Sequence, residues 1–236
     1  MLRSLTVLSF LMLAGCANTA TNSETAETPN TLTRAEANGG YKLLFDGSSM
    51  AHWRGFKKDD VPEGWVVADG AMGRTQSGGD IITREKYGSF ELRLEWKISP
   101  GGNSGIMWHV IESDAVNATY ESGPEMQILD DSGHPGIEPL NSAGACYGLY
   151  PAEVSAAKPV GEWNQVRLRV HRGKVEQWLN GSLICEYTLW SEDWNERVRA
   201  SKFSSMPHFA VAREGYIALQ DHQSPVWFRN LRVRRL

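Results

Sequence analysis

This chain has few cysteines, a small net charge and few long apolar runs. Three cysteines in 236 residues are too few for a disulfide-rich scaffold, and no Cys/His spacing indicates a structural zinc site. The net charge is only −4, and no basic run is interleaved with aromatic residues before the C-terminal strand, which argues against nucleic acid as a partner. We find no internal repeat. What remains is the composition of one globular domain with a substantial core.

The N-terminus has the pattern of an export signal. Met1-Leu-Arg3 is basic, residues 5–13 form an apolar run too short to cross a bilayer, and Leu13-Ala-Gly-Cys16 resembles the cleavage site of a bacterial lipoprotein. We therefore expect residues 1–15 to be a lipoprotein signal peptide and Cys16 to be diacylated, which anchors the protein to a membrane leaflet. Ala17 after the cysteine indicates the outer membrane, facing the periplasm. An ordinary secretory signal with an incidental cysteine is the alternative.

Residues 16–38 are expected to be the lipidated cysteine followed by a flexible tether. The segment is rich in Asn, Thr, Glu and Ala, so it has too little apolar surface to become ordered. Residues 39–236 then form the domain. Cys146 and Cys185 lie within it in apolar surroundings, so a disulfide and two free buried thiols are both compatible with the sequence.

Period-two alternation with turn signals between the runs predicts many short strands. In residues 89–98 the apolar side chains alternate cleanly with charged ones, so the apolar set faces inward. Residues 105–111 and 125–129 are apolar throughout, as expected for strands in the middle of a sandwich. Further strands are predicted at residues 41–45, 65–68, 163–170, 174–179 and 182–187, with a hairpin turn at Asn180-Gly181.

One helix is predicted. Ser191 can cap it, Glu192 and Asp193 suit its positive first turn, and it continues from Asn195 to Phe203. Many short strands, one short helix and 23 glycines together predict an all-β fold, a two-sheet antiparallel sandwich of the jelly-roll type.

The last two alternating runs, residues 215–222 and 225–236, predict a hairpin of two strands. On the first of them Ile217 and Leu219 face the core, whereas Gln220 and His222 face the other side. A strand with one apolar face and one that carries an amide and an imidazole is a candidate for a functional site.

Several segments, in order along the chain, resemble the family of 3-keto-disaccharide hydrolase domains. They are Leu44-Phe-Asp-Gly47 with Trp53, Tyr87-Gly-Ser-Phe-Glu-Leu92, Gly102-Asn-Ser-Gly-Ile106, Glu125-Met-Gln-Ile-Leu-Asp130, Gly161-Glu-Trp-Asn164, Ser201-Lys-Phe203, and Gly215-Tyr-Ile-Ala-Leu-Gln-Asp-His222 with Val226-Trp-Phe-Arg-Asn230. The resemblance implies the concanavalin-like lectin/glucanase fold and an exported enzyme that cleaves 3-keto-glycosides. It also implies a small carbohydrate substrate and, as a pathway partner, a sugar 3-dehydrogenase that makes the ketone.

Such a reaction has clear chemical needs. A ketone at carbon 3 acidifies the proton at carbon 2, so a base can remove that proton and expel the aglycone from carbon 1, and hydration completes a net hydrolysis. A base with a pKa near neutrality and an electrophile at the carbonyl oxygen are required. His222 or His109 fits the base. The electrophile is either a divalent metal ion held by His109, Glu125 and His222 or the amides of Gln127 and Gln220, and the sequence favours neither, so no cofactor is certain.

A second hypothesis concerns the strand at residues 125–129. Glu125 and Gln127 share the face opposite Met126 and Ile128, and Asp130 joins them if a bulge shifts the alternation. The pattern E-x-Q-x-x-D resembles the E-x-D-x-x-E of retaining β-glucanases with the same fold, whose two glutamates act as nucleophile and acid. A retaining glycoside hydrolase that uses Glu125 and Asp130 is therefore an alternative, although the glutamine and the shorter aspartate depart from that pattern.

Other residues are candidates for contacts with a sugar. His109 shares its strand face with Gly105, which leaves room for a ligand. Asp80 and Arg84 follow a Gly-Gly pair and are candidates for the rim of a site. Among the nine tryptophans, Trp53 and Trp108 are the better candidates for stacking on a sugar ring. A third hypothesis is a non-catalytic, carbohydrate-binding lipoprotein.

Overall fold

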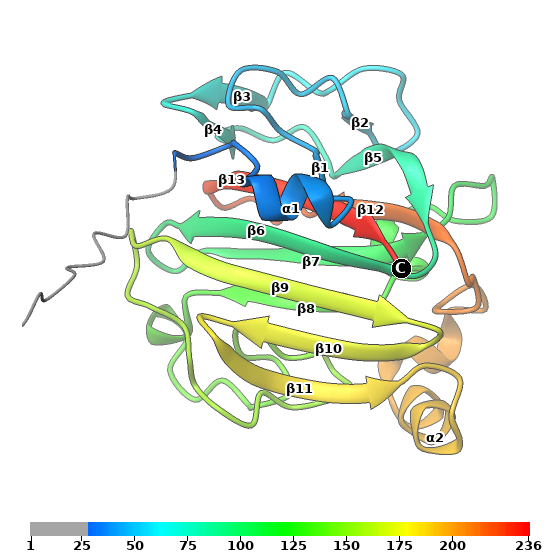
Figure 1. The fold of residues 1–236 in the computed structure, drawn as a ribbon. Coiled ribbons are helices and arrows are strands. Elements are labelled where there is room, and N and C mark those ends of the chain that lie inside the picture. The colour runs from blue at the N-terminus through cyan, green and yellow to red at the C-terminus, as the bar shows by residue number, and fades with distance from the viewer. Residues whose placement is uncertain (1–27) are drawn as a thin grey trace, which may run out of the picture.

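The computed structural model describes residues 28–236 (Figure 1). The predicted signal peptide, Cys16 and most of the predicted tether lie outside these described residues, so the structure does not bear on them. No helix within residues 28–236 is long and apolar enough to cross a membrane.

Eight strands of the described chain form one antiparallel sheet. Their order is β11-β10-β9-β6-β13-β4-β3, and β1 pairs with β13 at the end that β4 does not reach. The strands are β1 (Lys42–Leu43), β3 (Trp65–Ala68), β4 (Ala71–Arg74), β6 (Phe90–Ile98), β9 (Asn164–His171), β10 (Lys174–Leu179), β11 (Ser182–Thr188) and β13 (Val226–Arg235).

The other five strands form a second antiparallel sheet, in the order β2-β5-β12-β7-β8. They are β2 (Trp53–Gly55), β5 (Ile81–Tyr87), β7 (Asn103–Val110), β8 (Glu125–Leu129) and β12 (Gly215–Leu219). The prediction of an all-β sandwich of two antiparallel sheets is confirmed. β2, β4 and β5 were not predicted, because these strands are short or lack period-two alternation.

The core lies between the two sheets. Along β6 the inward side chains, from Phe90 to Ile98 at every second position, are at most 2% exposed. Met126, Ile128, Ile217 and Leu219 enter the same apolar cluster from the five-stranded sheet. Because alternate residues of a strand point to opposite faces, the polar neighbours of these residues must lie on the outer face of that sheet.

The two C-terminal strands do not form the predicted hairpin. β12 lies in the five-stranded sheet between β5 and β7, whereas β13 lies in the eight-stranded sheet between β6 and β4. The polar residues 220–225 are therefore a crossing from one sheet to the other. A turn signal between two alternating runs does not distinguish a hairpin from such a crossing, because both require the chain to reverse.

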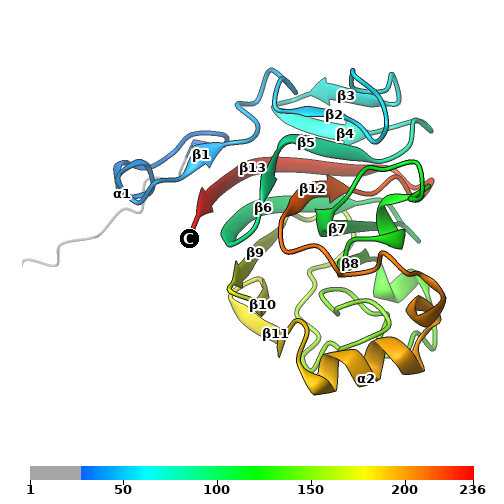
Figure 2. The same cartoon turned by 90° about the vertical axis from the view of Figure 1, so that its right-hand side faces the viewer.

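The helices are short. α2 (Glu192–Ala200) is capped by Ser191 as predicted, but it ends at Ser201, and the chain continues as the 3₁₀ turn η3 (Lys202–Ser205). Figure 2 shows α2 at the edge of the sandwich, near β11. Two other 3₁₀ turns are η1 (Thr119–Glu121) and η2 (Asp131–Gly133). The sequence allowed either a disulfide between Cys146 and Cys185 or two free thiols. In the structure both cysteines are free and buried.

The prediction of a flexible tether does not hold for residues 30–38. Helix α1 (Arg34–Asn38) begins at Thr33 with a capping box formed with Glu36. Asn30 and Asn230 exchange hydrogen bonds between their side-chain oxygens and backbone nitrogens, which ties the segment to β13. Polar contacts hold this segment in place, and apolar burial does not. Its composition, which is poor in apolar residues, therefore did not reveal that it is ordered.

Candidate active site

A cavity of about 410 Å³ opens on the outer face of the five-stranded sheet. Its volume lies in the range of about 300–1,000 Å³ typical of small-molecule sites. Segments outside the strands, at Tyr120, at Tyr147, at Lys202 and at His222, contribute to the cavity together with the sheet. The lining residues are Asp80, Asn103, Tyr120, Glu125, Gln127, Tyr147, Lys202, Phe203, Gln220, Asp221 and His222. Five of the predicted site residues are therefore brought together.

The strand register explains the floor of the cavity. Gly105 of β7 is paired with Gln127 of β8, and its carbonyl oxygen accepts a hydrogen bond from the backbone nitrogen of Gln220 at 3.0 Å. Leu219 is paired with Ile81, which places Gln220 opposite Asp80. Four neighbouring strands thus present Asp80, Gln220, Gly105 and Gln127 in one row. Because Gly105 has no side chain, the row is hollow in its middle.

Glu125 lies two residues before Gln127 on the same face of β8, over this hollow. Its side chain is 8% exposed, and no hydrogen-bonded partner from residues 28–236 meets its carboxyl group. Burial raises the pKa of Glu125 to about 8; Lys202 opposes this shift, and the nearby Asp80 carboxyl adds to it. A carboxyl group with a pKa near neutrality can exchange protons with a bound substrate.

Gln127 and Gln220 both carry an amide oxygen for which the described part of the chain offers no partner. Their side chains are 3% and 8% exposed. Buried polar atoms in folded proteins nearly always find a partner, so two such atoms at one cavity indicate a polar ligand. Together they present amide groups from two sides of Gly105.

Asp80 is held by neighbours at the opposite end of the row. Its carboxyl group accepts hydrogen bonds from the Thr119 hydroxyl and, at 2.8 Å, from the backbone nitrogen of Asp221. Burial raises the pKa of Asp80 in spite of these bonds. Asp221 in turn accepts from the backbone nitrogens of Gly78 and Gly79, both at 2.8 Å, and forms an ion pair of 2.5 Å with buried Arg74. Asp80 is thus a fixed part of the cavity wall.

The rim of the cavity is more open. His222 is exposed and follows Asp221 directly. Lys202 from η3 lies over the ring of Tyr147 at 4.4 Å from its centroid. The cavity also has lining residues that were not predicted as site residues: Asn103, Tyr120, Tyr147, Lys202, Phe203 and Asp221. The Asn-Ser-Gly, Ser-Lys-Phe and Gln-Asp-His segments of the family resemblance contained four of them, whereas nothing in the spacing placed the loop of Tyr147 beside β8.

The structure does not bring His109 to the cavity with the other predicted site residues. His109 has a left-handed backbone, with φ of 55°, and this turns its ring away from the face it would share with Gly105 in a regular strand. The ring Nε2 lies 2.8 Å from the Gly88 carbonyl oxygen, and the ring stacks on Trp190. The proposed metal ligands His109, Glu125 and His222 do not assemble; residues 28–236 bring no three His, Cys, Asp or Glu side chains into a metal-binding group.

Three further predicted contacts also lie elsewhere. Trp53 is fully buried and donates to the Leu44 carbonyl oxygen at 2.8 Å, and Trp108 is fully buried in the core. Both are packing residues. Arg84 is exposed and donates to the carbonyl oxygens of Ala51 and Asp59. Trp53 and Arg84 lie on β2 and β5, which periodicity did not reveal, whereas Trp108 lies on the core-facing side of β7, a strand that was predicted.

Asp130 does not join Glu125, because no bulge shifts its side chain to the cavity. Its carboxyl group instead caps η2 and accepts from the backbone nitrogen of Gly101 at 2.7 Å. It borders a separate hollow with Trp96 and Leu129. The paired carboxyl groups that a retaining glycosidase requires are therefore not formed by Glu125 and Asp130.

Residues 40–234 match the family model described as the 3-keto-alpha-glucoside-1,2-lyase-like domain. The chain belongs to this family. A relative from Bacteroides thetaiotaomicron, named 3-keto-disaccharide hydrolase, is 38% identical over 229 residues, covering 84% of this chain and 79% of the relative. The match makes the chain a member of an enzyme family, and the hypothesis of a purely binding protein loses its support.

Solved structures agree with the fold. A crystal structure from Parabacteroides distasonis, named provisionally as a glycosyl hydrolase, is 35% identical, has a TM-score of 0.84 and covers 89% of this chain and 100% of that one. A second structure from the same organism, with the same provisional name, has a TM-score of 0.65 at 24% identity, over 83% of this chain and 99% of that one. The second supports the architecture alone.

Proposed function

We propose that the cavity over Gly105 cleaves 3-keto-glycosides, 3-keto-disaccharides among them, by removing the proton next to the ketone. The observation that carries the proposal is the buried carboxyl group of Glu125, whose pKa of about 8 leaves it mostly protonated at neutral pH. A neutral carboxylic acid beside two unpartnered amide oxygens suits an uncharged, hydroxyl-rich ligand. The name of the Bacteroides relative supports the same substrate class.

The first half of the proposed reaction is an elimination. His222 at the open rim accepts the proton from carbon 2, and the electrons of that C–H bond form the double bond between carbons 1 and 2. The bond between carbon 1 and the glycosidic oxygen breaks, and Glu125 gives its proton to the departing oxygen. Asp80 lies near enough to His222 for their charges to interact, so it would stabilise the imidazolium that forms.

The second half adds water to the unsaturated ketone. A hydroxyl group forms at carbon 1 and a proton returns to carbon 2, so the sum is hydrolysis. Gln127 and Gln220 would hold the substrate through its hydroxyl groups and carbonyl oxygen during both halves. Their amides are held on either side of β7, by β8 and by the end of β12, so they need little reorganisation as charge develops on the ketone oxygen.

The experiment compares a 3-keto-disaccharide with its unoxidised parent in D₂O, with and without chelator. Elimination followed by hydration predicts cleavage of the keto sugar alone, with deuterium at carbon 2 of the product from the first turnovers. Product incubated with the protein corrects for spontaneous exchange. Glu125→Gln should lower kcat by about 10²–10⁴-fold, and the control His208→Ala, outside the cavity, should not. Cleavage of the parent at a similar rate, or product without deuterium, would contradict this mechanism.

We also propose the cellular setting. A lipid on Cys16 would hold the enzyme at the outer membrane facing the periplasm, as the sequence pattern Leu13-Ala-Gly-Cys16 suggests. An oxidoreductase of the sugar 3-dehydrogenase class would have to supply the ketone. Metabolic labelling with a fatty acid tests the anchor: label should appear on the intact protein and vanish in Cys16→Ser. Label retained in that variant would contradict the anchor without bearing on the cleavage reaction.

A further inference from the structure

A second hollow, which we call the arginine groove, lies on the outer face of the eight-stranded sheet. It has a volume of about 410 Å³ and runs across β10, β9, β6 and β13, which lie side by side in Figure 1. Its polar lining includes Arg93, Arg167, Arg232, Gln165, Asn230 and Trp178. Both sheets of the sandwich separate it from the candidate active site. Nothing in the proposed reaction uses it.

The register aligns three arginines directly across the groove. Arg167 is paired with Arg93, and Arg93 is paired with Arg232 on its other side; Trp178 continues the row beyond Arg167. Like charges directly opposite one another on a sheet face are destabilising. Such a row therefore needs negative charge from elsewhere to balance it.

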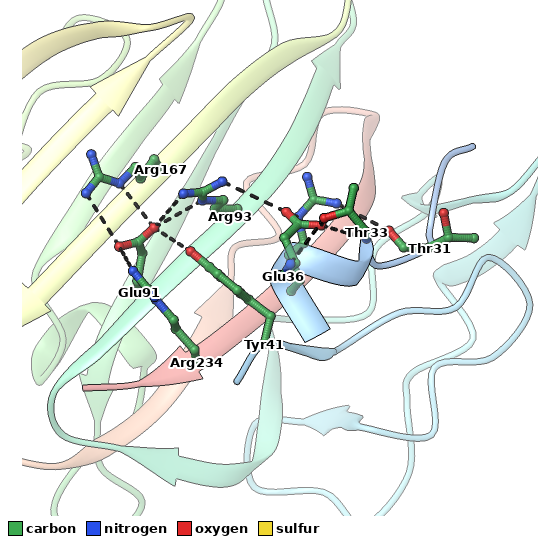
Figure 3. Close-up of polar contacts among 9 residues, drawn as sticks. Thr31, Thr33, Glu36, Tyr41, Glu91, Arg93, Arg167 and Arg234 are labelled. Carbon is green, nitrogen blue, oxygen red and sulfur yellow. Dashed lines mark hydrogen bonds and ion pairs between the residues drawn. The ribbon is translucent and has the colours of Figure 1, made fainter. Parts of the chain in front are cut away.

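The protein supplies only part of that negative charge. Glu91, fully buried beneath the row, is contacted by Arg93 at 3.0 Å, Arg167 at 3.2 Å and Arg234 at 3.0 Å, and Figure 3 shows these three side chains converging on its carboxyl group. Glu36 of α1 pairs with Arg232 at 2.9 Å. Four guanidinium groups thus share two carboxylates, which leaves two positive charges in excess.

Other nearby carboxylates do not remove this excess. Glu95 also lines the groove, but it is paired with Arg229 at 2.6 Å, so that pair is neutral by itself. The side chains of Arg93 and Arg167 remain 39% and 35% exposed, so their charge reaches the solvent. Arg167 meets Glu91 through Nε at 3.2 Å and Nη2 at 3.5 Å, which leaves Nη1 for another acceptor. A guanidinium with a free edge binds a planar carboxylate or a sulfate better than it binds a neutral group.

The remaining lining fits a sugar ring. Trp178 is half-buried, and its indole lies 5.4 Å from the Arg167 guanidinium, while the amides of Gln165 and Asn230 lie within the same hollow. An aromatic face and amide groups are suited to the C–H face and the hydroxyl groups of a pyranose. Beyond the groove, Lys97 lies between the rings of Trp163 and Trp227, at 4.9 and 5.3 Å from their centroids, so alternating rings and cations continue along the sheet.

We propose that the arginine groove binds an acidic oligosaccharide, one whose sugars carry carboxylate or sulfate groups. The excess of guanidinium charge selects the anion, and Trp178 with the two amides selects the sugar. The groove would hold the enzyme on an acidic glycan while the other sheet carries out cleavage. This inference is independent of the chemistry proposed for Glu125, because no residue is shared.

The test is calorimetric titration of the mature chain with a galacturonic acid tetramer, a sulfated heparin tetrasaccharide and the neutral maltotetraose. We expect one or both acidic tetramers to bind, maltotetraose not to bind, and the dissociation constant to rise with salt. Arg167→Lys keeps a cation beside Glu91 but removes the planar fork, and it should weaken binding at least tenfold, as should Trp178→Ala. Arg199→Gln on exposed α2 removes a positive charge outside the groove, a larger change of charge than Arg167→Lys makes, and should bind as the parent does.

Three results would overturn the proposal. One is failure of both acidic tetramers to bind at low salt; another is equal weakening by Arg199→Gln, which would indicate unspecific attraction. The third is binding to vesicles of anionic phospholipid, lost in Arg167→Lys, with no binding of the tetramers, which would assign the groove to a membrane surface. Cleavage of the 3-keto-disaccharide by the variants should remain at the parent level, so failure here is separable from failure of the proposed function.

Discussion

The α-carbon of Gly105 faces the carboxyl group of Glu125 on the neighbouring strand, with no room for a side chain between them. A β-carbon at residue 105 would lie 2.1 Å from Oε1 of Glu125 and 2.7 Å from its Cδ. Gly105 is therefore required by the position of Glu125, and not by its own backbone. The missing side chain of Gly105 leaves the space that the Glu125 carboxyl group occupies at the cavity.

Gly105→Ala should therefore move the Glu125 carboxyl group without touching substrate. We expect a loss of activity of about 10²-fold, because a displacement of 1 Å can cost that much, and a loss of stability of about 1–3 kcal/mol from overpacking. Keto-sugar cleavage and urea unfolding measure the two effects.

The control is a double-mutant cycle with Glu125→Ala. Once the longer side chain is absent, Gly105→Ala should cost little further stability. If its cost is the same in both backgrounds, the clash with Glu125 is not its cause.

Glu125 should also give stability a pH dependence of its own. Its pKa is raised from 4.5 when unfolded to about 8 when folded, so folding favours the protonated form. The stability that depends on this proton is present below pH 4.5 and is lost as the pH rises toward 8. Glu125→Gln stays neutral, so its stability relative to the parent should rise by on the order of 1–3 kcal/mol between pH 5 and 9. A constant difference across that range would mean that the carboxyl group is not buried as described.

The sequence was informative wherever one strand carried its own alternation. The order Glu125, Met126, Gln127, Ile128 was enough to place the side chains of Glu125 and Gln127 on the outer face. The alternation in β12 likewise placed Gln220 on the face opposite the core. No such pattern tells which strands are neighbours. The row from Asp80 to Gln127 depends on the pairing of four strands that are far apart in sequence, so Asp80 could be only a rim candidate.

The errors have a common physical cause. His109 and the two C-terminal strands were placed by assuming regular strands and local pairing, whereas Asp130 was placed by assuming a bulge that the pairing of β7 with β8 does not contain. At His109 a single left-handed residue reverses the side chain, and after Leu219 the chain crosses between sheets. Both events are decided by tertiary packing, and neither leaves a mark in the alternation of polar and apolar residues.

Asp221 is expected to be essential for stability rather than chemistry. Its ion pair with Arg74 joins side chains that are 3% and 5% exposed, so Asp221→Asn would leave a buried guanidinium without its counter-ion. We expect a loss of about 3–5 kcal/mol. Arg74→Gln combined with Asp221→Asn should recover part of this loss, since two neutral amides can bond to each other. Urea titrations of the three variants give the values, and a loss below 1 kcal/mol for Asp221→Asn would contradict a buried pair.

Glu91 should control stability in acid. Burial by itself would raise its pKa, but the hydrogen bonds from Tyr41, Arg234, Arg167 and Arg93 outweigh it and lower the pKa from 4.5 to about 2. A depressed pKa means that the stabilisation is complete above pH 4.5 and disappears as the pH falls toward 2. Because the arginine partners are partly exposed and screened, we expect about 1–2 kcal/mol from this group.

The free energy of unfolding of Glu91→Gln should therefore change less between pH 5 and 2.5 than that of the parent. Glu186→Gln provides the matched control: it lies in an exposed pair with Lys174, so its acid dependence should follow that of the parent. Identical acid dependence in all three proteins would show that the guanidinium cluster does not hold Glu91 ionised, and the excess positive charge inferred for the groove would then have to be recalculated.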